Sequence, residues 1–283
     1  MKPAPFAYAR ARSVEEAVAL LAEKPDAKVL AGGQSLIATL NMRLSAPALL
    51  VDINGIDGRD GIVHKGGMVE IGALARHVQA ERSEVIASFA PLLASAMPHI
   101  GHPAIRNRGT IGGSIAFADP AAELPACLLA LGGEIEAQGP EGKRTIKADD
   151  FFRGLFETAL GAQDVLTAVR VPAAAQDTRT GFAELTRRHG DYAIIGLAAS
   201  AKADGMGLKD VRLAYFGVGA TPVRARQAEA ALSGEASEKR IDAAIAALEL
   251  DPPDDVQATG AAKKHLAGVL LRGVVRQLME PAR

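Results

Sequence analysis

Apolar positions recur along this chain with two different periods, which predicts a mixture of helices and strands. Near the N-terminus, apolar residues follow helical spacing over 14–21, and Ser13 with Glu16 forms a capping box at the start of that helix. A short continuous apolar run at 28–31 predicts a buried strand, and the run at 49–53 predicts another. The first part of the chain is therefore predicted to be a small α/β unit with a parallel strand pair.

The middle of the chain alternates short strand patterns with helical ones. We expect strands over 68–74, 134–137, 144–148 and 165–171, and helices over 84–98 and 125–131. The two strands around Gly-Pro-Glu-Gly at 139–142 predict a hairpin. The Gly- and Asp-rich stretch at 58–65 predicts a turn between two subdomains.

The last third of the chain has a different pattern, which begins after a polar stretch at 172–180 that reads as a linker. We expect strands over 182–188, 194–203 and 211–216, followed by helices over 224–232, 239–248 and 261–279. Three consecutive strands with short turns predict an antiparallel meander. The whole chain is thus predicted to be α+β, with units over 1–57, 58–175 and 177–283.

Composition and charge exclude several classes of protein. Charged residues make up 23% of the 283 and the net charge is −1, so the chain lacks the excess of basic residues that is typical of nucleic-acid-binding proteins. The apolar runs are too short to span a bilayer, and the N-terminus lacks the apolar core of a signal peptide. The single cysteine, Cys127, excludes an iron–sulfur cluster or a Cys-rich zinc site held by this chain alone, and the six histidines show no metal-binding spacing. We expect a cytoplasmic protein with no metal ion of its own.

The first candidate for chemistry is the glycine pair Gly32-Gly33, which ends the strand at 28–31. Gln34-Ser35 then opens a helix whose first apolar residue is Leu36. Paired glycines permit positive φ, and the amides of such a turn can converge into an anion-binding nest. The helix start behind it adds N–H groups and the positive end of the dipole. On this segment alone, an ordinary strand-to-helix turn remains an equal alternative.

A second stretch of the same kind, Gly112-Gly113, is followed by Ser114 and another apolar run. Two such stretches favour a pair of loops that close on a ligand with more than one phosphate. Each charge-assisted hydrogen bond to a diphosphate contributes about 1.5–3 kcal/mol, so two loops can hold it without a covalent bond. Neither stretch has the glycine spacing of a Rossmann or Walker nucleotide motif.

Taken together, four segments resemble one family. These segments are Ala-Gly-Gly-Gln-Ser at 31–35, the stretch 100–114 that runs from Ile-Gly-His-Pro to Ile-Gly-Gly-Ser, Ala-Asp-Pro-Ala-Ala-Glu-Leu-Pro-Ala at 118–126, and Gly-Asp-Tyr-Ala-Ile at 190–194. They are similar to the FAD-binding medium subunits of molybdenum hydroxylases, the family of carbon monoxide dehydrogenase and of the xanthine dehydrogenase flavin domain. The later segment 218–225 extends the resemblance over nearly the whole chain.

This resemblance implies a two-subdomain FAD-binding fold of the vanillyl-alcohol-oxidase type, followed by a C-terminal domain with a three-stranded antiparallel sheet and helices. It implies non-covalent FAD on this chain, a molybdenum cofactor on a large partner subunit and two [2Fe–2S] clusters on a small one. The three subunits would form a heterotrimer that pairs into a dimer. Electrons would pass from the clusters through FAD to an external acceptor, and no side chain of this chain would act as a catalytic acid or base.

The same resemblance implies the residues of the site. The two glycine segments would bind the FAD diphosphate and its surroundings, Ile100 and Leu166 would line the cofactor, Glu123 would bond it, and Tyr192 would pack near the isoalloxazine. The predicted cofactor-binding residues are Ala31, Gly32, Gly33, Gln34, Ser35, Leu36, Ile100, Thr110, Ile111, Gly112, Gly113, Ser114, Glu123, Leu166 and Tyr192.

Two positions depart from the family's pattern. Glu184 stands where many members have Lys, which puts a cationic contact there in doubt. Ala104 stands where many have Gln, which puts the arrangement of that loop in doubt.

Two functions of other classes remain open. A self-sufficient FAD oxidoreductase of the vanillyl-alcohol-oxidase type would need acid or base residues over the ring, and the sequence does not single out such residues. A non-catalytic nucleotide-binding module would bind no flavin and would be colourless. In the favoured interpretation the substrate, ranging from carbon monoxide to aldehydes and N-heterocycles, binds on another chain.

Overall fold

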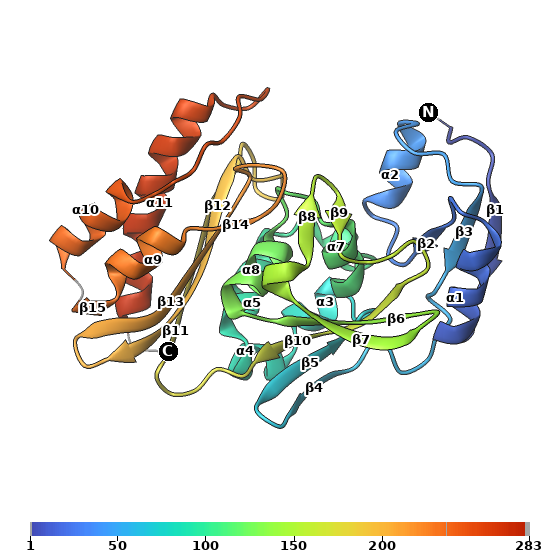
Figure 1. The fold of residues 1–283 in the computed structure, drawn as a ribbon, viewed down its shortest axis with the longest axis horizontal. Helices are drawn as coiled ribbons and strands as arrows, with labels where there is room; N and C mark the ends of the chain where they lie inside the picture. Colours follow the sequence, from blue (N-terminus) through green and yellow to red (C-terminus); the bar gives the residue numbers. More distant parts are fainter. Residues whose placement is uncertain (1, 236, 281–283) are drawn as a thin grey trace.

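The computed structural model describes residues 2–235 and 237–280. Its main parts follow one another along the long axis of the molecule, from the N-terminal unit at one end to the C-terminal helices at the other (Figure 1). Each part is built around its own sheet. Within the described residues, no helix has both the length and the hydropathy required to cross a membrane.

The N-terminal sheet is small and parallel. Its strands, in spatial order, are β1 (Ala7–Arg10), β3 (Leu49–Asp52) and β2 (Lys28–Leu30), and its helices are α1 (Val14–Glu23) and α2 (Leu36–Asn41). The predicted parallel pair of β2 and β3 is confirmed. Ser13 caps α1 by accepting a hydrogen bond from the amide of Glu16 at 3.1 Å. The sequence pattern did not predict β1, which is only four residues long, lies at the edge of its sheet and has no fully buried residue.

The middle part holds a five-stranded antiparallel sheet and most of the short helices. The strands, in spatial order, are β4 (Ile62–Lys65), β5 (Met68–Gly72), β10 (Val165–Pro172), β6 (Glu134–Gly139) and β7 (Gly142–Lys147). The helices are α3 (His77–Glu81), α4 (Glu84–Phe89), α5 (Pro91–Ala96), η1 (Met97–His99), α6 (Pro103–Arg106), α7 (Ile111–Phe117), α8 (Glu123–Leu131) and η2 (Ala148–Asp150). A separate hairpin of β8 (Phe152–Gly154) and β9 (Glu157–Thr158) completes this part.

Two predictions for the middle part were wrong in detail. The stretch 58–65 is not wholly a turn, because β4 occupies its second half at the edge of the sheet, where its side chains are mostly exposed. The single helix expected over 84–98 is divided at Ala90, because Pro91 cannot donate the backbone hydrogen bond that a continuous helix requires. Pro91 instead starts α5, a position that suits its fixed φ.

The C-terminal part confirms the expected antiparallel meander and enlarges it. Its elements are β11 (Thr178–Leu185), β12 (Ile195–Asp204), β13 (Gly207–Phe216), β14 (Val223–Arg224), α9 (Arg226–Leu232), β15 (Gly234–Glu235), α10 (Glu238–Ala246) and α11 (Gly260–Met279). The short strands β14 and β15 both pair with β13, so the sheet has more than the three strands expected. β11 also begins inside the stretch that was predicted to be a linker.

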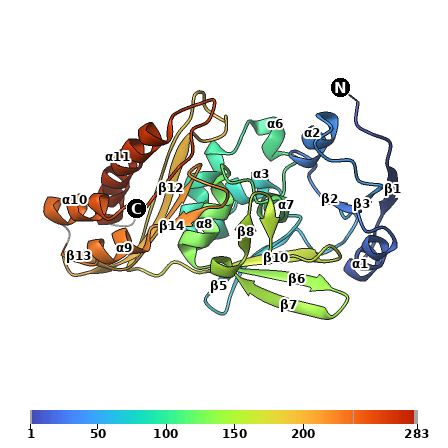
Figure 2. The same cartoon turned by 45° about the horizontal axis from the view of Figure 1, so that its top comes forward.

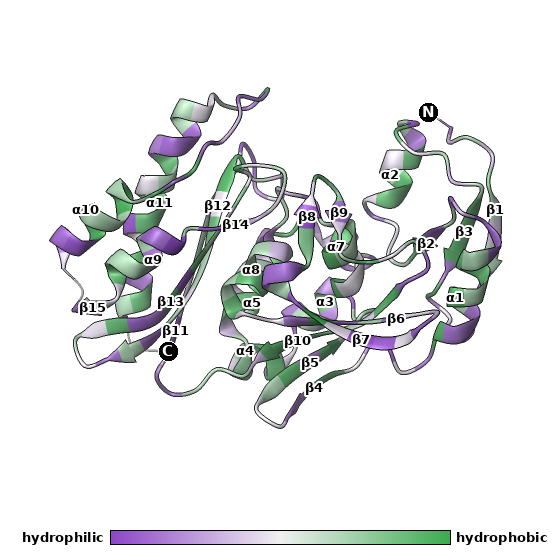
Figure 3. Cartoon of the chain, viewed as in Figure 1, coloured by the Kyte–Doolittle hydropathy of each residue, from purple (hydrophilic) through white to green (hydrophobic). Residues whose placement is uncertain are grey.

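Both faces of the C-terminal sheet are buried, which explains how this part is fixed to the rest. Along β12, Leu197 and Ala199 pack into a cluster with the C-terminal helices, whereas Ala198 packs into the core of the middle part. The sheet lies between α9–α11 on one side and α5 and α8 on the other (Figure 1). Colouring by hydropathy shows apolar strands between these layers, with polar positions concentrated on the outer helices (Figure 3).

A cluster of ion pairs joins the middle part to the C-terminal sheet. Asp149, in η2, accepts hydrogen bonds from Arg212 at 2.7 Å, from Arg224 at 3.1 Å and from Arg226 at 2.8 Å. The side chains of Arg224, Arg212 and Asp149 are 11%, 24% and 27% exposed, so the cluster is partly shielded from solvent. Burial alone would raise the pKa of Asp149, but the hydrogen bonds from Arg212 and Arg224 outweigh it and hold that pKa below its usual value. Asp149 therefore stays ionised and holds the two parts together.

We expect Asp149→Asn to lower the free energy of unfolding by about 1–3 kcal/mol, because it removes the charge that three guanidinium groups share. Chemical denaturation of the two proteins at neutral pH measures the difference. Asp150→Asn is the matched control, since Asp150 is adjacent and exposed and forms no ion pair among the described residues. Equal losses for both variants would contradict a role of the Asp149 cluster in joining the two parts.

Candidate functional site

A cleft of about 1000 Å³ runs between the N-terminal part and the middle part and reaches the C-terminal part at its far end. Leu21 and Ala27 line one end of it, and Tyr192 lines the other. The volume is at the upper end of the roughly 300–1,000 Å³ that is usual for small-molecule sites. All parts of the chain contribute to the walls, so the cleft forms only when the whole chain is folded.

The first glycine turn supplies free backbone donors to this cleft. Gly33 has φ of +73°, a conformation that favours glycine. Among the hydrogen bonds found between described residues, none is donated by the amides of Gly32, Gly33, Gln34 or Ser35. All four residues line the cleft, and Ser35 precedes α2 without using its hydroxyl as a cap. A turn with a positive-φ glycine and unused amides is suited to bind an anion.

Gly32 has a different reason to be glycine. A Cβ atom on Gly32 would lie 2.4 Å from the carbonyl oxygen of Arg108 and 2.8 Å from the Cα of Gly109, so the two loops are in backbone contact. In Figure 2 the turn before α2 lies beside the segment that follows α6. Any side chain at position 32 would force these loops apart and open the cleft between them.

A hydrogen-bond network holds the same two loops together. The amide nitrogen of the Asn54 side chain donates to the carbonyl of Ala31 at 2.8 Å, and Arg76 donates to the Asn54 side-chain oxygen at 2.7 Å. The Arg76 guanidinium also donates to the carbonyl of Arg108. The first glycine turn and the second loop are therefore linked through side chains of the strands and turns behind them.

The second glycine pair differs from the expectation that it is a turn of the same kind. Gly112 and Gly113 lie in the first turn of α7 with ordinary helical backbone, capped by Thr110. Their amides are already used, since Gly112 donates to the carbonyl of Ala73 at 2.9 Å and Gly113 donates to the Thr110 hydroxyl at 3.1 Å. Gly112 is required because a Cβ would lie 2.6 Å from the Cβ of Ala73. This segment therefore offers the cleft small side chains and the Ser114 hydroxyl rather than free amides.

His77 holds the loop at 108–110 by hydrogen bonds. The sequence did not predict this role. The Nε2 of His77 donates to the carbonyl of Thr110 at 3.0 Å, and its backbone amide donates to the carbonyl of Gly109 at 3.0 Å. Burial lowers the pKa of His77 to about 4, so the ring is neutral at pH 7. A Cβ on Gly109 would lie 2.9 Å from the Nδ1 of this ring, so the loop packs directly on the imidazole.

The far end of the cleft is formed by the turn at 190–192. Gly190 has φ of +85°, and a Cβ there would lie 2.8 Å from the carbonyl oxygen of Gly101. This close approach fixes Tyr192 at the cleft, with 56% of its surface exposed. Asp119 lines the same end, and burial raises the pKa of its carboxyl. An exposed aromatic ring at the mouth of a cleft can stack on a flat ligand.

Glu123, the first residue of α8, lines the cleft and is 7% exposed. Burial raises its pKa to about 8, so it is largely protonated at pH 7.

Glu184 is not among the described residues that line the cleft; its carboxylate lies behind the wall, 3.2 Å from Nδ1 of His99. The cationic contact that the sequence left in doubt at Glu184 is therefore replaced by an acid–imidazole pair. The other departure, Ala104, is exposed on α6.

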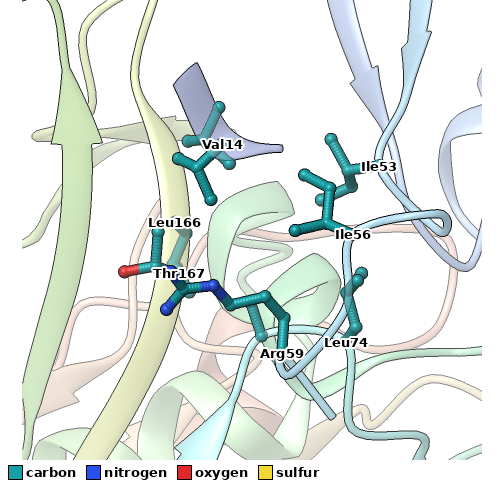
Figure 4. A pocket seen from close by; sticks show the side chains of 9 residues that line it. Val14, Ile53, Ile56, Arg59, Leu74, Leu166 and Thr167 are labelled. Atoms are coloured by element: carbon teal, nitrogen blue, oxygen red, sulfur yellow. The ribbon is translucent and has the colours of Figure 1, made fainter. Parts of the chain in front are cut away.

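Nearly all the residues predicted to bind the cofactor line this one cleft. They are Ala31, Gly32, Gly33, Gln34, Ser35, Leu36, Ile100, Thr110, Gly112, Gly113, Ser114, Glu123, Leu166 and Tyr192. Ile111 is the exception, because its side chain is buried in the core of the middle part and its amide donates to the carbonyl of Ala75. Leu166 also borders a small cavity of about 10 Å³, where it lies with Thr167 opposite Ile53 and Ile56 (Figure 4).

Several residues of the cleft were missed because nothing in the sequence marks them. Phe156 lines the cleft from the β8–β9 hairpin with φ of +57° and packs edge-on against Phe117, with ring centroids 5.1 Å apart. Asp164 lines it too and accepts from the amide of Gly161 at 2.7 Å. Asp119 had a signal, since it belongs to the Ala-Asp-Pro segment that carried the family resemblance. The hairpin and Asp164 had none, because local sequence does not tell which loops meet across a cleft.

Comparison with known proteins decides the family. A model described as the FAD binding domain in molybdopterin dehydrogenase matches residues 4–174, and one described as the CO dehydrogenase flavoprotein C-terminal domain matches residues 180–278. The chain belongs to this FAD-binding family. It is a medium subunit of the molybdenum hydroxylase type, and it is an oxidoreductase subunit.

Relatives and solved structures agree with this family over the full length of the medium subunit. This chain is 40% identical over 280 residues to the 6-hydroxypseudooxynicotine dehydrogenase complex subunit alpha of Paenarthrobacter nicotinovorans. The alignment covers 98% of this chain and 95% of that subunit. It is 36% identical to the nicotine 6-hydroxylase medium subunit of the same organism, with 97% and 98% covered. Carbon monoxide dehydrogenase from Hydrogenophaga pseudoflava matches in structure with a TM-score of 0.96 and 38% identity, covering 98% of each chain.

We expect His77→Gln to reduce the loss of stability of the medium subunit on acidification. The pKa of His77 is lowered in the fold from about 6.5 to about 4, so the unfolded chain binds a proton that the folded chain refuses between these values. The wild type therefore loses stability as pH falls from about 6.5 to 4, by up to about 3 kcal/mol at 1.36 kcal/mol per pKa unit.

Denaturation curves of wild type and His77→Gln at pH 7, 5.5 and 4 give this difference directly. His265→Gln, at an exposed position on α11, is the control and should follow the wild type. A constant offset between wild type and His77→Gln at all three pH values would contradict the neutral buried imidazole.

Proposed function

We propose that this medium subunit carries FAD in the cleft, takes electrons from the two [2Fe–2S] clusters of a small partner subunit and passes them to an external acceptor. A large partner subunit would hold the molybdenum cofactor and oxidise the substrate. The three chains would form a heterotrimer that pairs into a dimer in the cytoplasm. We further propose that the chain is divided into units over 1–57, 58–175 and 177–283, since each main sheet is confined to one of these ranges.

The observation that carries the proposal is the set of unused amides at Gly32, Gly33, Gln34 and Ser35, on the wall of a cleft of about 1000 Å³. Free N–H donors in such a turn are suited to bind the diphosphate that joins the two halves of FAD. A side chain at position 32 would collide with the backbone of Arg108 and Gly109, so the wall of the cleft keeps its shape only with glycine there. The residues present therefore fit the group that the family is known to bind.

Other residues would hold the two ends of the cofactor. Ser114 would offer a hydroxyl to the diphosphate or ribose, and Ile100 and Leu166 would pack on the flavin side. Glu123, being protonated, would donate a hydrogen bond to the ring, and Tyr192 would cover the exposed end of the cleft. When bound there, FAD accepts and releases electrons singly or in pairs, and the chain's task is to orient the ring and limit access to it.

The names of the relatives support a substrate on another chain. They include complexes that act on nicotine, caffeine and carbon monoxide, although their medium subunits resemble this one at similar identities. If this subunit contacted the substrate, such different molecules would demand different clefts. We therefore propose that substrate choice resides in the large subunit, and N-heterocycles, aldehydes and carbon monoxide remain the candidate substrates.

We expect Gly33→Val to abolish retention of FAD. A β-branched residue at φ of +73° forces the turn to rearrange, and a Cβ there would also meet Ile37 and Leu30 within 3.3 Å, so the amides no longer converge. Gly58→Val is the matched control, because Gly58 has φ of +70° with open space around it and lies outside the cleft. Flavin absorbance of the purified proteins, per mole of chain, measures retention.

The proposal would be contradicted by a Gly33→Val protein that folds and retains a full complement of flavin. Loss of flavin in both variants would mean that strain at any positive-φ glycine is enough to prevent flavin binding. The effect would then not be specific to the turn at 32–35. Retention in Gly58→Val with loss in Gly33→Val is the outcome that the proposal requires.

The division of labour between subunits is tested by the metal content of the separated chain. We expect the purified full chain to bind FAD and to contain no iron, because its single cysteine, Cys127, is buried in α8 and cannot supply the four ligands of a cluster. Iron analysis of the chain and of the intact complex gives the comparison. Stoichiometric iron in the separated chain, or turnover of a small alcohol or phenol by it alone, would favour a self-sufficient oxidoreductase instead.

A further inference from the structure

We propose that His99, Glu184 and Glu123 form a proton relay that connects the protein surface to the cleft and supplies the proton that accompanies reduction of FAD. The proposal rests on the proposed function, because the flavin gives the proton its destination. It also revises the expectation from the sequence that no side chain of this chain acts as an acid or base.

The three groups span the wall from the surface to the cleft. The side chain of His99, the last residue of η1, is 36% exposed, and its Nδ1 lies 3.2 Å from Oε1 of Glu184. The Glu184 side chain, on β11, is only 3% exposed. Glu123 is 7% exposed, interacts electrostatically with both partners and lines the cleft. An accessible imidazole thus contacts a buried carboxylate, and that carboxylate lies within electrostatic range of a carboxyl group in the cleft.

The second oxygen of Glu184 supports a transfer role. Oε2 is buried and has no hydrogen-bond partner among the residues that the structure describes, which is unusual for a carboxylate in a protein interior. Because Oε1 is engaged by His99, Oε2 can accept or release a proton without breaking that contact. An unsatisfied buried acceptor costs free energy, so Oε2 is the oxygen to which we assign the transfer.

The protonation states at the two ends suit a relay. Burial, together with the negative charges of Glu184 and Asp119, raises the pKa of Glu123 to about 8, so a proton is held at the cleft near neutral pH. The hydrogen bond to Glu184 raises the pKa of His99, which brings its titration closer to neutral pH. Both ends can therefore gain and lose a proton in the working range of an enzyme.

Other titratable groups face the relay and must be considered with it. On the cleft side these are Asp119 and Tyr192, both of which interact electrostatically with Glu123. Asp119 accepts from the amide of Ala121 at 2.9 Å, which holds it in a turn. On the inner side lies Cys127, whose pKa burial raises well above its usual value. On the outer side the His189 ring centroid is 6.0 Å from that of His99.

The proton balance of the relay is simple. The protonated carboxyl of Glu123 gives its proton to the cleft as two electrons arrive from the clusters of the small subunit. A proton then passes from the imidazolium of His99 through Glu184 to the Glu123 carboxylate, and His99 takes a proton from solvent. When the external acceptor removes the electrons, the proton returns by the same groups. Only O–H and N–H bonds form and break, so no further reactant is needed.

The test uses the complete complex with its FAD, reduced by dithionite in a stopped-flow instrument and followed by the loss of flavin absorbance in H₂O and in D₂O. We expect Glu184→Gln, which keeps the shape but cannot carry the proton, to slow this reduction roughly tenfold or more, in the range of general acid catalysis. We expect His99→Ala to slow it similarly and added imidazole to restore the rate. His265→Gln is the control and should match the wild type in rate and in solvent isotope effect.

Unchanged rates and isotope effects in both relay variants, with flavin content intact, would overturn the relay and leave the proposed function standing. Slowing of His99→Ala that imidazole does not relieve would show a structural role and would also overturn it. If Glu184→Gln fails to assemble, His99→Ala decides, because His99 is partly exposed and lies outside the cleft lining. A wild-type complex without flavin would contradict the proposed function and the relay together.

Discussion

The backbone contact between Gly32 and the Arg108–Gly109 segment is the constraint on which the rest of the site depends. It brings a turn of the small N-terminal sheet against a loop of the middle part, at a separation that excludes even a methyl group. Asn54 and Arg76 hold the two loops from behind by hydrogen bonds to their carbonyls. With the loops fixed in this way, the amides of the first turn stay unpaired on the wall of a large cleft, which is the condition for binding an anionic ligand.

The two glycine pairs look alike in sequence but work differently. Gly33 provides positive φ and leaves free amides around it, whereas Gly112 permits α7 to pack closely on Ala73 and its amide is satisfied within the protein. The turn at Gly33 is thus suited to bind a negatively charged group. The segment at Gly112 mainly positions the wall of the cleft that faces this turn. The C-terminal sheet then closes the far end of the cleft, because both of its faces are buried and the turn carrying Tyr192 is fixed against Gly101.

The sequence predicted those features that depend on local pattern. The helical spacing after Ser13, the apolar run before Gly32 and the three strands of the meander all depend on nearby residues, and the structure has them close to the expected positions. The edge strands β1 and β4 are only four residues long and bury little, so neither was predicted from the sequence. Nearly all the residues that the family resemblance predicted line the cleft, but the resemblance could not show that the amides around Gly112 are occupied. The roles of His77 and of the His99–Glu184 pair arise from contacts between segments 33 and 85 residues apart, which no local pattern contains.

The most direct test of this account is an experimental structure of the intact complex with its flavin. The account predicts that the diphosphate of FAD lies within hydrogen-bonding distance of the amides of Gly32 to Ser35, with the flavin ring toward Glu123 and Tyr192. A structure in which these amides contact no phosphate, or in which the flavin lies outside this cleft, would contradict it.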